Sequence, residues 1–283
     1  MPLTRLQKLV SSAAFAALFA SSLAADNPLP RAPQDYFGGY GYCALILERS
    51  RLRETMIEVG PEQCSQMLSP CSTFKVPNAL IGLQTGVVTG PDDLKRWDGK
   101  QRPRKVSNQD HTLASAINQS IVWYFQALAR DVGGERMSAW LEKLEYGNQD
   151  ISGGIDNFWL ASSLKIDAYG QLELIKSLWH GTLPFDPDKQ AQVRDMLTLE
   201  SDLDGTLHGK TGGCPGGLEQ NPENHGWFVG WVDWNEARRQ DPYVSYFAIN
   251  ITGNEKRGQA AKLAALEILH DLHPVAVIHR TKE

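Results

Sequence analysis

Two periodicities of hydrophobic residues divide the chain into strand-like and helix-like segments. Near the start of the chain and again in its last third, apolar and polar residues alternate in short runs, which is typical of strands. The expected strands are 40–47, 55–60, 207–212, 226–234 and 244–251. Between these groups, and once after the last strand, apolar residues recur at the spacing of amphipathic helices. The expected helices are 72–83, 112–130, 134–144, 172–179, 188–199 and 260–272.

Strands at both ends of the chain with helices between them predict an α+β fold. The two terminal groups of strands would complete one sheet, flanked by helices, with an inserted helical lobe and a cleft between the two parts. The expected sheet lobe comprises about 26–70 and 165–283, and the helical lobe about 71–164. Pro77 is an awkward residue inside the first expected helix, because proline removes a backbone donor.

The first 25 residues have the organisation of a secretory signal. Two cations precede a run rich in Ala, Leu and Phe, and small residues follow, so cleavage is expected after Ala24 or Ala25. The mature chain, 26–283, would then be a single periplasmic or secreted domain. The alternative is an uncleaved anchor, but the apolar run is short and rich in alanine. No later segment is apolar enough to cross a membrane.

The composition and charge of the chain indicate which kind of partner it binds. The 283-residue chain is 42% hydrophobic, carries a formal net charge of -5 and has its Lys and Arg residues scattered. We therefore expect neither nucleic acid nor an anionic membrane as a partner, and we expect the ligand to be a small molecule. A chain of this size is expected to be a monomer or a homodimer.

Four cysteines in an exported chain favour disulfides, and four allow three pairings. Our preferred pairing joins Cys43 to Cys64 across the first strand pair, and Cys71 to Cys214; free buried thiols are the alternative. The cysteines lack zinc-type spacing, so no metal site is expected.

Ser72-Thr73-Phe74-Lys75 and Lys210-Thr211-Gly212 carry the clearest chemistry. In a helix, positions i and i+3 share a face, so the Lys75 amine can accept the proton of the Ser72 hydroxyl. Lys210 would attract a carboxylate. The two segments together predict acyl transfer on a substrate that bears a carboxylate.

Further motifs follow Ser72 in order: Ser120-Ile121-Val122, Tyr146-Gly147-Asn148 and Phe158-Trp159-Leu160. With the two segments above, this set resembles the class D serine β-lactamases among the penicillin-recognising serine enzymes. The resemblance implies an antiparallel sheet flanked by helices and an activity that hydrolyses penicillins and other β-lactams, conferring resistance. It also implies an acyl-serine intermediate, with a carboxylated Lys75 (N6-carboxylysine) as general base. Carbon dioxide or bicarbonate is the source of that group, and no other cofactor is expected.

The same resemblance assigns roles to the remaining motif residues. Ser120 would relay a proton between Lys75, Lys210 and the leaving nitrogen, so Ser72, Lys75, Ser120 and Lys210 are the expected catalytic residues. Val122 and Trp159 would surround and orient the base, and the Trp159 indole can donate to it. The residues expected to hold the substrate are Lys210, Thr211, Gly212, Gly213 and Arg257, with the Ser72 and Gly213 N–H groups as oxyanion hole. Lys262 is the alternative to Arg257, and the Tyr146-Gly147-Asn148 loop is equally compatible with substrate contact and with a scaffold role.

Two alternative functions share these motifs. One is a penicillin sensor that stays acylated, and the other is a peptidoglycan carboxypeptidase that uses the same serine. A sensor must signal across a membrane, which the sequence does not favour. The apolar Val122 and Trp159 favour an enzyme that completes deacylation. Substrate range depends on loops that the sequence does not define, notably 91–108 and 215–217.

Overall fold

The computed structural model describes residues 28–235 and 243–274. The predicted signal segment 1–25 lies outside the described residues. Within the described part, strands before residue 60 and after residue 197 form the main sheet, and helices dominate the sequence between them.

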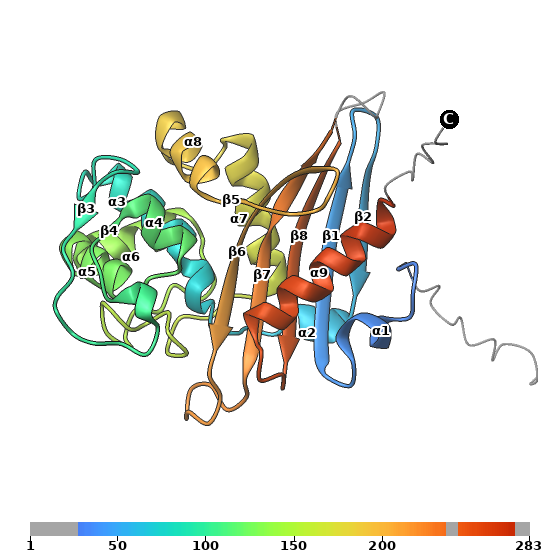
Figure 1. The fold of residues 1–283 in the computed structure, drawn as a ribbon, viewed down its shortest axis with the longest axis horizontal. Helices are drawn as coiled ribbons and strands as arrows, with labels where there is room; N and C mark the ends of the chain where they lie inside the picture. Colours follow the sequence, from blue (N-terminus) through green and yellow to red (C-terminus); the bar gives the residue numbers. More distant parts are fainter. Residues whose placement is uncertain (1–27, 236–242, 275–283) are drawn as a thin grey trace, which may run out of the picture.

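In the described part of the chain, six strands form one antiparallel sheet in the order β2-β1-β8-β7-β6-β5. The pairing of β1 with β8 joins residues about 200 positions apart, with Ala44 opposite Ile249. The sheet is therefore completed by the two ends of the domain, as the sequence predicts (Figure 1). The strands are β1 (Gly41–Arg49), β2 (Glu54–Val59), β5 (Thr198–Leu199), β6 (Gly205–Cys214), β7 (His225–Trp234) and β8 (Val244–Thr252).

The central strands are buried on both faces. Successive side chains of a strand point to opposite faces, and in β8 Tyr246 and Ala248 belong to one core whereas Phe247 and Ile249 belong to the other. Helix α9 (Gly258–Leu272) covers the second face, and helix α7 (Ala168–His180) covers the first (Figure 1). The sheet thus holds two separate cores between its helical layers.

The remaining helices gather mainly beside the β6 and β5 edge of the sheet (Figure 1). This helical region is joined to β6 by the short 3-10 helix η1 (Cys71–Phe74), which packs directly against that strand. The other elements are α1 (Pro33–Phe37), α2 (Pro61–Cys64), α3 (Lys75–Gln84), β3 (Leu94–Lys95), η2 (Lys105–Ser107), β4 (His111–Thr112), α4 (Leu113–Asn118), α5 (Val122–Val132), α6 (Gly134–Lys143) and α8 (Pro187–Met196).

Three expected helices differ from the structure. The expected helix 72–83 begins as the 3-10 helix η1, and α3 starts only at Lys75. The expected helix 112–130 is two helices, α4 and α5, because Ser120 has a left-handed backbone with φ of 55°. Pro77 is accommodated in the first turn of α3, where a missing N–H costs little. The expected helix 188–199 ends at Met196, and Thr198–Leu199 pairs with β6 instead.

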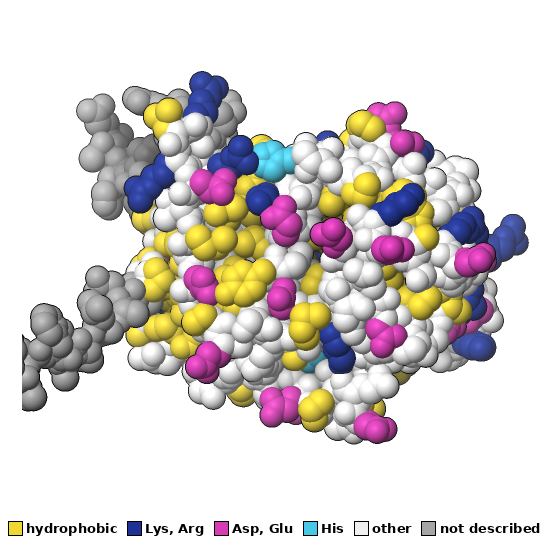
Figure 2. Space-filling model, turned by 180° about the vertical axis from the view of Figure 1, so that it is seen from behind, with side chains coloured by type: hydrophobic (Ala, Val, Ile, Leu, Met, Phe, Trp, Pro, Cys, Tyr) yellow, Lys and Arg dark blue, Asp and Glu magenta, His cyan; other side chains and the backbone are white. Residues whose placement is uncertain are grey.

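The surface differs between the two halves of the molecule. From behind, hydrophobic side chains gather over the sheet half, and Lys and Arg side chains lie both at the upper end of that half and at the opposite, helical end (Figure 2). Among the described residues, no helix combines the length and the apolar character needed to cross a membrane.

Both preferred disulfides are present. Cys43 is bonded to Cys64, which ties α2 to β1, and Cys71 is bonded to Cys214, which ties η1 to the end of β6. The second bond closes a far longer stretch of chain, with a sequence separation of 143 against 21. The preferred pairing is confirmed.

These separations predict unequal losses of stability. In the chain-entropy model, removing Cys71–Cys214 should lower the free energy of unfolding by about 5 kcal/mol and removing Cys43–Cys64 by about 3 kcal/mol. The double variants Cys71→Ala/Cys214→Ala and Cys43→Ala/Cys64→Ala form a matched pair for urea unfolding followed by tryptophan fluorescence. Equal losses would contradict the expectation that loop length decides the difference.

Candidate active site

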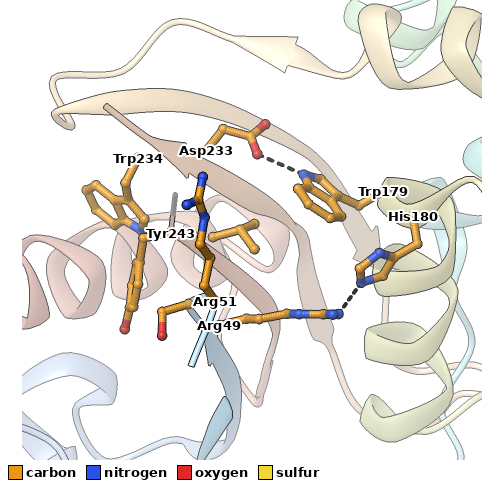
Figure 3. A pocket seen from close by; sticks show the side chains of 9 residues that line it. Arg49, Arg51, Trp179, His180, Asp233, Trp234 and Tyr243 are labelled. Atoms are coloured by element: carbon orange, nitrogen blue, oxygen red, sulfur yellow. Dashed lines mark hydrogen bonds between the residues drawn. The ribbon is translucent and has the colours of Figure 1, made fainter. Parts of the chain in front are cut away.

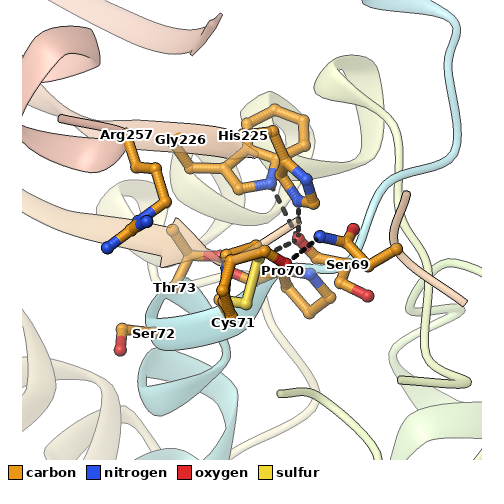
Figure 4. The surroundings of a disulfide bond; sticks show 12 residues. Ser69, Pro70, Cys71, Ser72, Thr73, His225, Gly226 and Arg257 are labelled. Atoms are coloured by element: carbon orange, nitrogen blue, oxygen red, sulfur yellow. Dashed lines mark hydrogen bonds between the residues drawn. A yellow bond between two sulfur atoms is a disulfide. The ribbon is translucent and has the colours of Figure 1, made fainter. Parts of the chain in front are cut away.

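The loop before Ser72 is held in place by strand β7. The Ser69 carbonyl accepts hydrogen bonds from His225 Nε2 at 2.8 Å and from Trp227 Nε1 at 3.0 Å, and all three residues are buried (Figure 4). Two side-chain donors on one carbonyl fix the direction from which the chain enters η1. Burial lowers the pKa of His225, against the opposing effect of its hydrogen bonds to backbone groups at Ser69 and Glu223. Nε2 can donate to the Ser69 carbonyl in the neutral tautomer that carries the proton there.

The residue before the nucleophile is held in an unusual conformation. Cys71 has a φ of 47°, which is uncommon for a residue other than glycine. Its N–H donates to the Trp159 carbonyl at 3.0 Å and its sulfur is bonded to Cys214. These restraints place Ser72 at the start of the helical region, half-buried, beside β6.

Ser72 and Lys75 form the predicted pair. Lys75 Nζ is hydrogen-bonded to Ser72 Oγ at 2.6 Å. The Lys75 side chain is 0% exposed, and its amine lies 5.7 Å from the ring centroid of Phe125 on α5. Burial, followed by the positive charges of Lys210 and Arg104, holds the pKa of Lys75 well below its usual range. A neutral amine is a proton acceptor, so the pair has the properties of a nucleophile with its base.

Ser120 and Lys210 form a second pair across the site. Lys210 Nζ donates to Ser120 Oγ at 3.0 Å, and joins the loop between α4 and α5 to strand β6. Burial and the charge of Arg104 lower the pKa of Lys210 to about 7. The left-handed backbone at Ser120 interrupts the helix at the position from which its hydroxyl meets β6. The sequence placed this serine inside a helix; the structure puts it in the break.

Trp159 has a buried donor without an acceptor. Its indole is 0% exposed, and among the described residues its Nε1 has no hydrogen-bond partner. The ring stacks on Phe74, with centroids 5.4 Å apart, and Phe74 directly precedes Lys75. Buried donors are almost always paired, so an unpaired indole here indicates a missing acceptor.

Val122 occupies a different environment from Trp159. It is the first residue of α5 and is 38% exposed, so full burial of Lys75 does not rest on it alone. Phe125 is the aromatic neighbour that sequence reasoning missed. It lies three residues after Val122 and hence on the same helical face, which was the available signal.

Glycines allow strand β6 to approach the nucleophile segment. A Cβ on Gly212 would lie 2.6 Å from the Pro70 carbonyl oxygen and 3.3 Å from the Thr73 nitrogen, so only glycine fits. Gly213 is exposed, next along the same strand. The Ser72 and Gly213 N–H groups stay the predicted oxyanion hole, on two segments that are in contact.

The start of α9 brings Arg257 over β6 and its neighbour β7, where Gly213 pairs with Gly226. A Cβ on Gly226 would lie 1.9 Å from the carbonyl carbon of Arg257, so this glycine permits the approach. The Arg257 side chain passes over Gly213 and donates to Asn224 Oδ1 at 3.3 Å, and it extends toward the side of Ser72 (Figure 4). Lys262 lies more than one helical turn further along α9. There Lys262 lines a small pocket with Lys210 and Thr211, so it remains the alternative cation for the substrate carboxylate. Arg257 stays our choice, because it lies over Gly213.

The Tyr146-Gly147-Asn148 loop has the geometry of a scaffold. Tyr146 is 2% exposed and packs edge-on against Phe74, with ring centroids 5.6 Å apart. A Cβ on Gly147 would lie 1.9 Å from the Lys165 carbonyl oxygen, and the Asn148 side chain bridges the Lys165 N–H and the Ser163 carbonyl. The loop thus supports the segment that carries Trp159.

A cavity of about 390 Å³ lies elsewhere, at the end of the sheet near β1 and α7 (Figure 3). Its polar groups are engaged with one another: Arg49 contacts the His180 ring, and Trp179 Nε1 donates to Asp233 at 2.7 Å. Among the described lining residues, the Ser50 hydroxyl is hydrogen-bonded to backbone groups of Leu52 and Arg53 and not to the His180 ring, so volume alone does not identify the site. Among the described residues, no group of three His, Cys, Asp or Glu side chains could hold a metal ion.

Comparisons with known proteins agree with this geometry. Residues 45–271 match the family model of the penicillin binding protein transpeptidase domain. The chain is 43% identical over 208 residues to "Probable beta-lactamase YbxI" of Bacillus subtilis (strain 168), covering 74% of this chain and 73% of that protein. It is 42% identical over 189 residues to "Beta-lactamase OXA-10" of Pseudomonas aeruginosa, covering 67% and 68%.

Solved structures give the same result. The fold matches "Class D beta-lactamase BAT-2" with a TM-score of 0.75 and 37% identity, covering 87% of this chain and 97% of that one. It matches "Structure of BPu1 beta-lactamase" with a TM-score of 0.77 and 37% identity, covering 88% and 99%. With its serine and lysine pairs in place, this chain belongs to the class D β-lactamases, serine hydrolases that act on the amide of the β-lactam ring.

Proposed function

We propose that the protein hydrolyses penicillins through an acyl-Ser72 intermediate and that Lys75 works as a carboxylated lysine. The observation that carries this proposal is the buried Lys75 amine, 2.6 Å from Ser72 Oγ, next to a segment with an unpaired indole donor. The first feature supplies a nucleophile. The second feature, the Trp159 N–H, is a buried donor that needs an acceptor.

The residues present fit a carbamate on Lys75. Only a neutral amine reacts with carbon dioxide, and burial lowers the pKa of Lys75 in the direction that gives one. The Trp159 N–H would donate to a carbamate oxygen and so hold the group in place. When bound, the group supplies the general base for acylation and for deacylation.

The protein's own residues account for acylation of the substrate. Ser72 Oγ forms the bond to the β-lactam carbonyl carbon and loses its proton toward residue 75, and the carbon–nitrogen bond of the ring breaks. Ser120 can pass a proton to the leaving nitrogen and recover one from Lys210, 3.0 Å away. Water then cleaves the Ser72 ester, which releases the opened product and restores the serine.

The substrate carboxylate is assigned to Lys210, Thr211 and Arg257. These residues lie on β6 and at the start of α9, and supply two cations and a hydroxyl on one side of the nucleophile. The bicyclic nucleus of every penicillin carries one carboxylate at a fixed distance from the lactam carbonyl, which suits such an anchor. Export to the periplasm or medium is part of the proposal and is supported by the two disulfides. Secretion of such an enzyme would confer resistance to β-lactams.

Turnover and intact mass test the proposal together. The mature protein should hydrolyse benzylpenicillin, and added bicarbonate should raise the rate. Ser72→Ala should give no turnover and no covalent adduct, because the attacking oxygen is gone. A stable adduct on the unaltered protein without turnover would instead indicate a penicillin sensor, and an adduct on the variant would refute Ser72 as nucleophile.

Trp159→Phe should lower turnover by about tenfold, since it removes one charge-assisted hydrogen bond but keeps the ring that stacks on Phe74. High bicarbonate should restore part of the loss. Trp231→Phe is the matched control, because the Trp231 N–H donates to Asp233, away from Ser72. Equal kinetics for the Trp159 variant and the unaltered protein would remove the indole from the mechanism.

Carbamate formation should depend on pH with a defined sign. Lys75 is neutral above its lowered pKa, so the carbamate signal in carbon-13 NMR with labelled bicarbonate should be present at neutral pH and disappear on acidification. Lys210→Met removes a positive neighbour and should shift this loss to higher pH. Lys95→Met is the control, since Lys95 pairs with Asp131. A signal that persists unchanged in acid would contradict the assignment of Lys75.

A further inference from the structure

A strongly basic segment lies in the loop between β3 and η2. Residues 95–105 contain six cations and a single acidic residue, Asp98, in a chain whose formal net charge is -5. The cations are Lys95, Arg96, Lys100, Arg102, Arg104 and Lys105. This is a high local concentration of positive charge in a chain that is acidic as a whole.

Two of these cations are already neutralised by partners. Lys95 Nζ lies 2.7 Å from Asp131 and Arg102 lies 2.7 Å from Asp98. Arg104 differs: among the described residues, no carboxylate lies within ion-pair distance of it. Its side chain is instead held by a hydrogen bond from Nη2 to the Gln119 carbonyl oxygen at 2.8 Å. An exposed arginine is thus fixed in place without a counter-ion.

The anchor point of Arg104 is next to the active site. Gln119 immediately precedes Ser120, whose hydroxyl lies 3.0 Å from Lys210 Nζ. The charge of Arg104 reaches into the site, because it contributes to the lowered pKa values of both Lys75 and Lys210. Arg104 therefore stands at the rim of the reaction centre, on the helical side.

Arg257 occupies the sheet side of the same centre. It lies over Gly213 on β6, whereas Arg104 is attached to the loop between α4 and α5. The site thus has a cation on each side. The Lys210, Thr211 and Arg257 group accounts for one substrate carboxylate, which leaves Arg104 with capacity for another anionic group.

We propose that Arg104 is a specificity-determining residue that binds a second carboxylate, carried on the acyl side chain of the β-lactam. The inference rests on the proposed penicillinase function and extends it to dianionic substrates. A guanidinium held by one hydrogen bond to a carbonyl keeps further N–H groups available, and its planar fork suits a carboxylate. Because the residue is exposed, the interaction should weaken as salt screens it.

Carbenicillin and benzylpenicillin test this directly, because they differ by one carboxylate on the acyl side chain. In Arg104→Gln the ratio of kcat/KM for carbenicillin to that for benzylpenicillin should fall about fivefold at low salt. Added sodium chloride should lower the ratio in the unaltered protein and change it little in the variant. Lys105→Gln removes the same charge from the neighbouring exposed position and should leave the ratio unaltered.

Each other outcome has a distinct meaning. Equal losses for the two substrates would overturn the proposal and assign Arg104 to the carboxylate that all penicillins share. Unchanged kcat/KM values for both substrates would overturn it as well. Absence of benzylpenicillin turnover in the unaltered protein would refute the proposed function itself, whatever Arg104 does.

Discussion

Burial of the Lys75 amine beside Ser72 is the constraint on which the rest of the site depends. A charged ammonium with no exposed surface is costly, and no carboxylate among the described residues offsets it. The fold instead surrounds the amine with Phe125 and with other cations, Lys210 and Arg104. Burial and the two neighbouring cations disfavour the charged form. The same environment favours the neutral amine, which can accept a proton.

Building such a site requires groups from both halves of the molecule. The nucleophile and its lysine come from the helical region, and Lys210 comes from the sheet. Three kinds of link hold the halves in register: the Cys71–Cys214 bond, the Ser69 carbonyl clamped from β7, and glycines that let β6 approach η1. The left-handed residue Cys71 lies where these links converge. Its positive φ is an example of an unusual backbone conformation next to a functional residue.

The positive charges around the active site also come from both halves of the molecule. The protein as a whole is acidic, but the cations Lys210, Arg104 and Arg257 surround the nucleophile from the sheet side and the helical side. This arrangement suits anionic substrates, and two of its members, Lys210 and Arg104, also lower the pKa of Lys75. One set of charges thus serves recognition and chemistry.

The sequence by itself determined most of the strand and helix order, a sheet closed by both ends of the domain, and the Ser72, Lys75 and Lys210 segments; the antiparallel pairing and the role of Ser120 were implied by the resemblance to class D β-lactamases. Periodicity and short motifs encode these features locally. It did not determine that Ser120 interrupts a helix, because the left-handed backbone is stabilised by contacts with β6 that lie 90 residues away. Nor did it determine the solvent-accessible position of Val122.

Only the tertiary structure decided which distant groups surround the amine. Phe125 and Arg104 reach the site through helix register and through a loop anchored at Gln119, and neither belongs to a motif. The unpaired Trp159 indole is also a tertiary fact, because a donor lacks a partner only in relation to everything packed around it. Sequence specifies which groups are available for chemistry; burial and long-range packing set their pKa values and their partners.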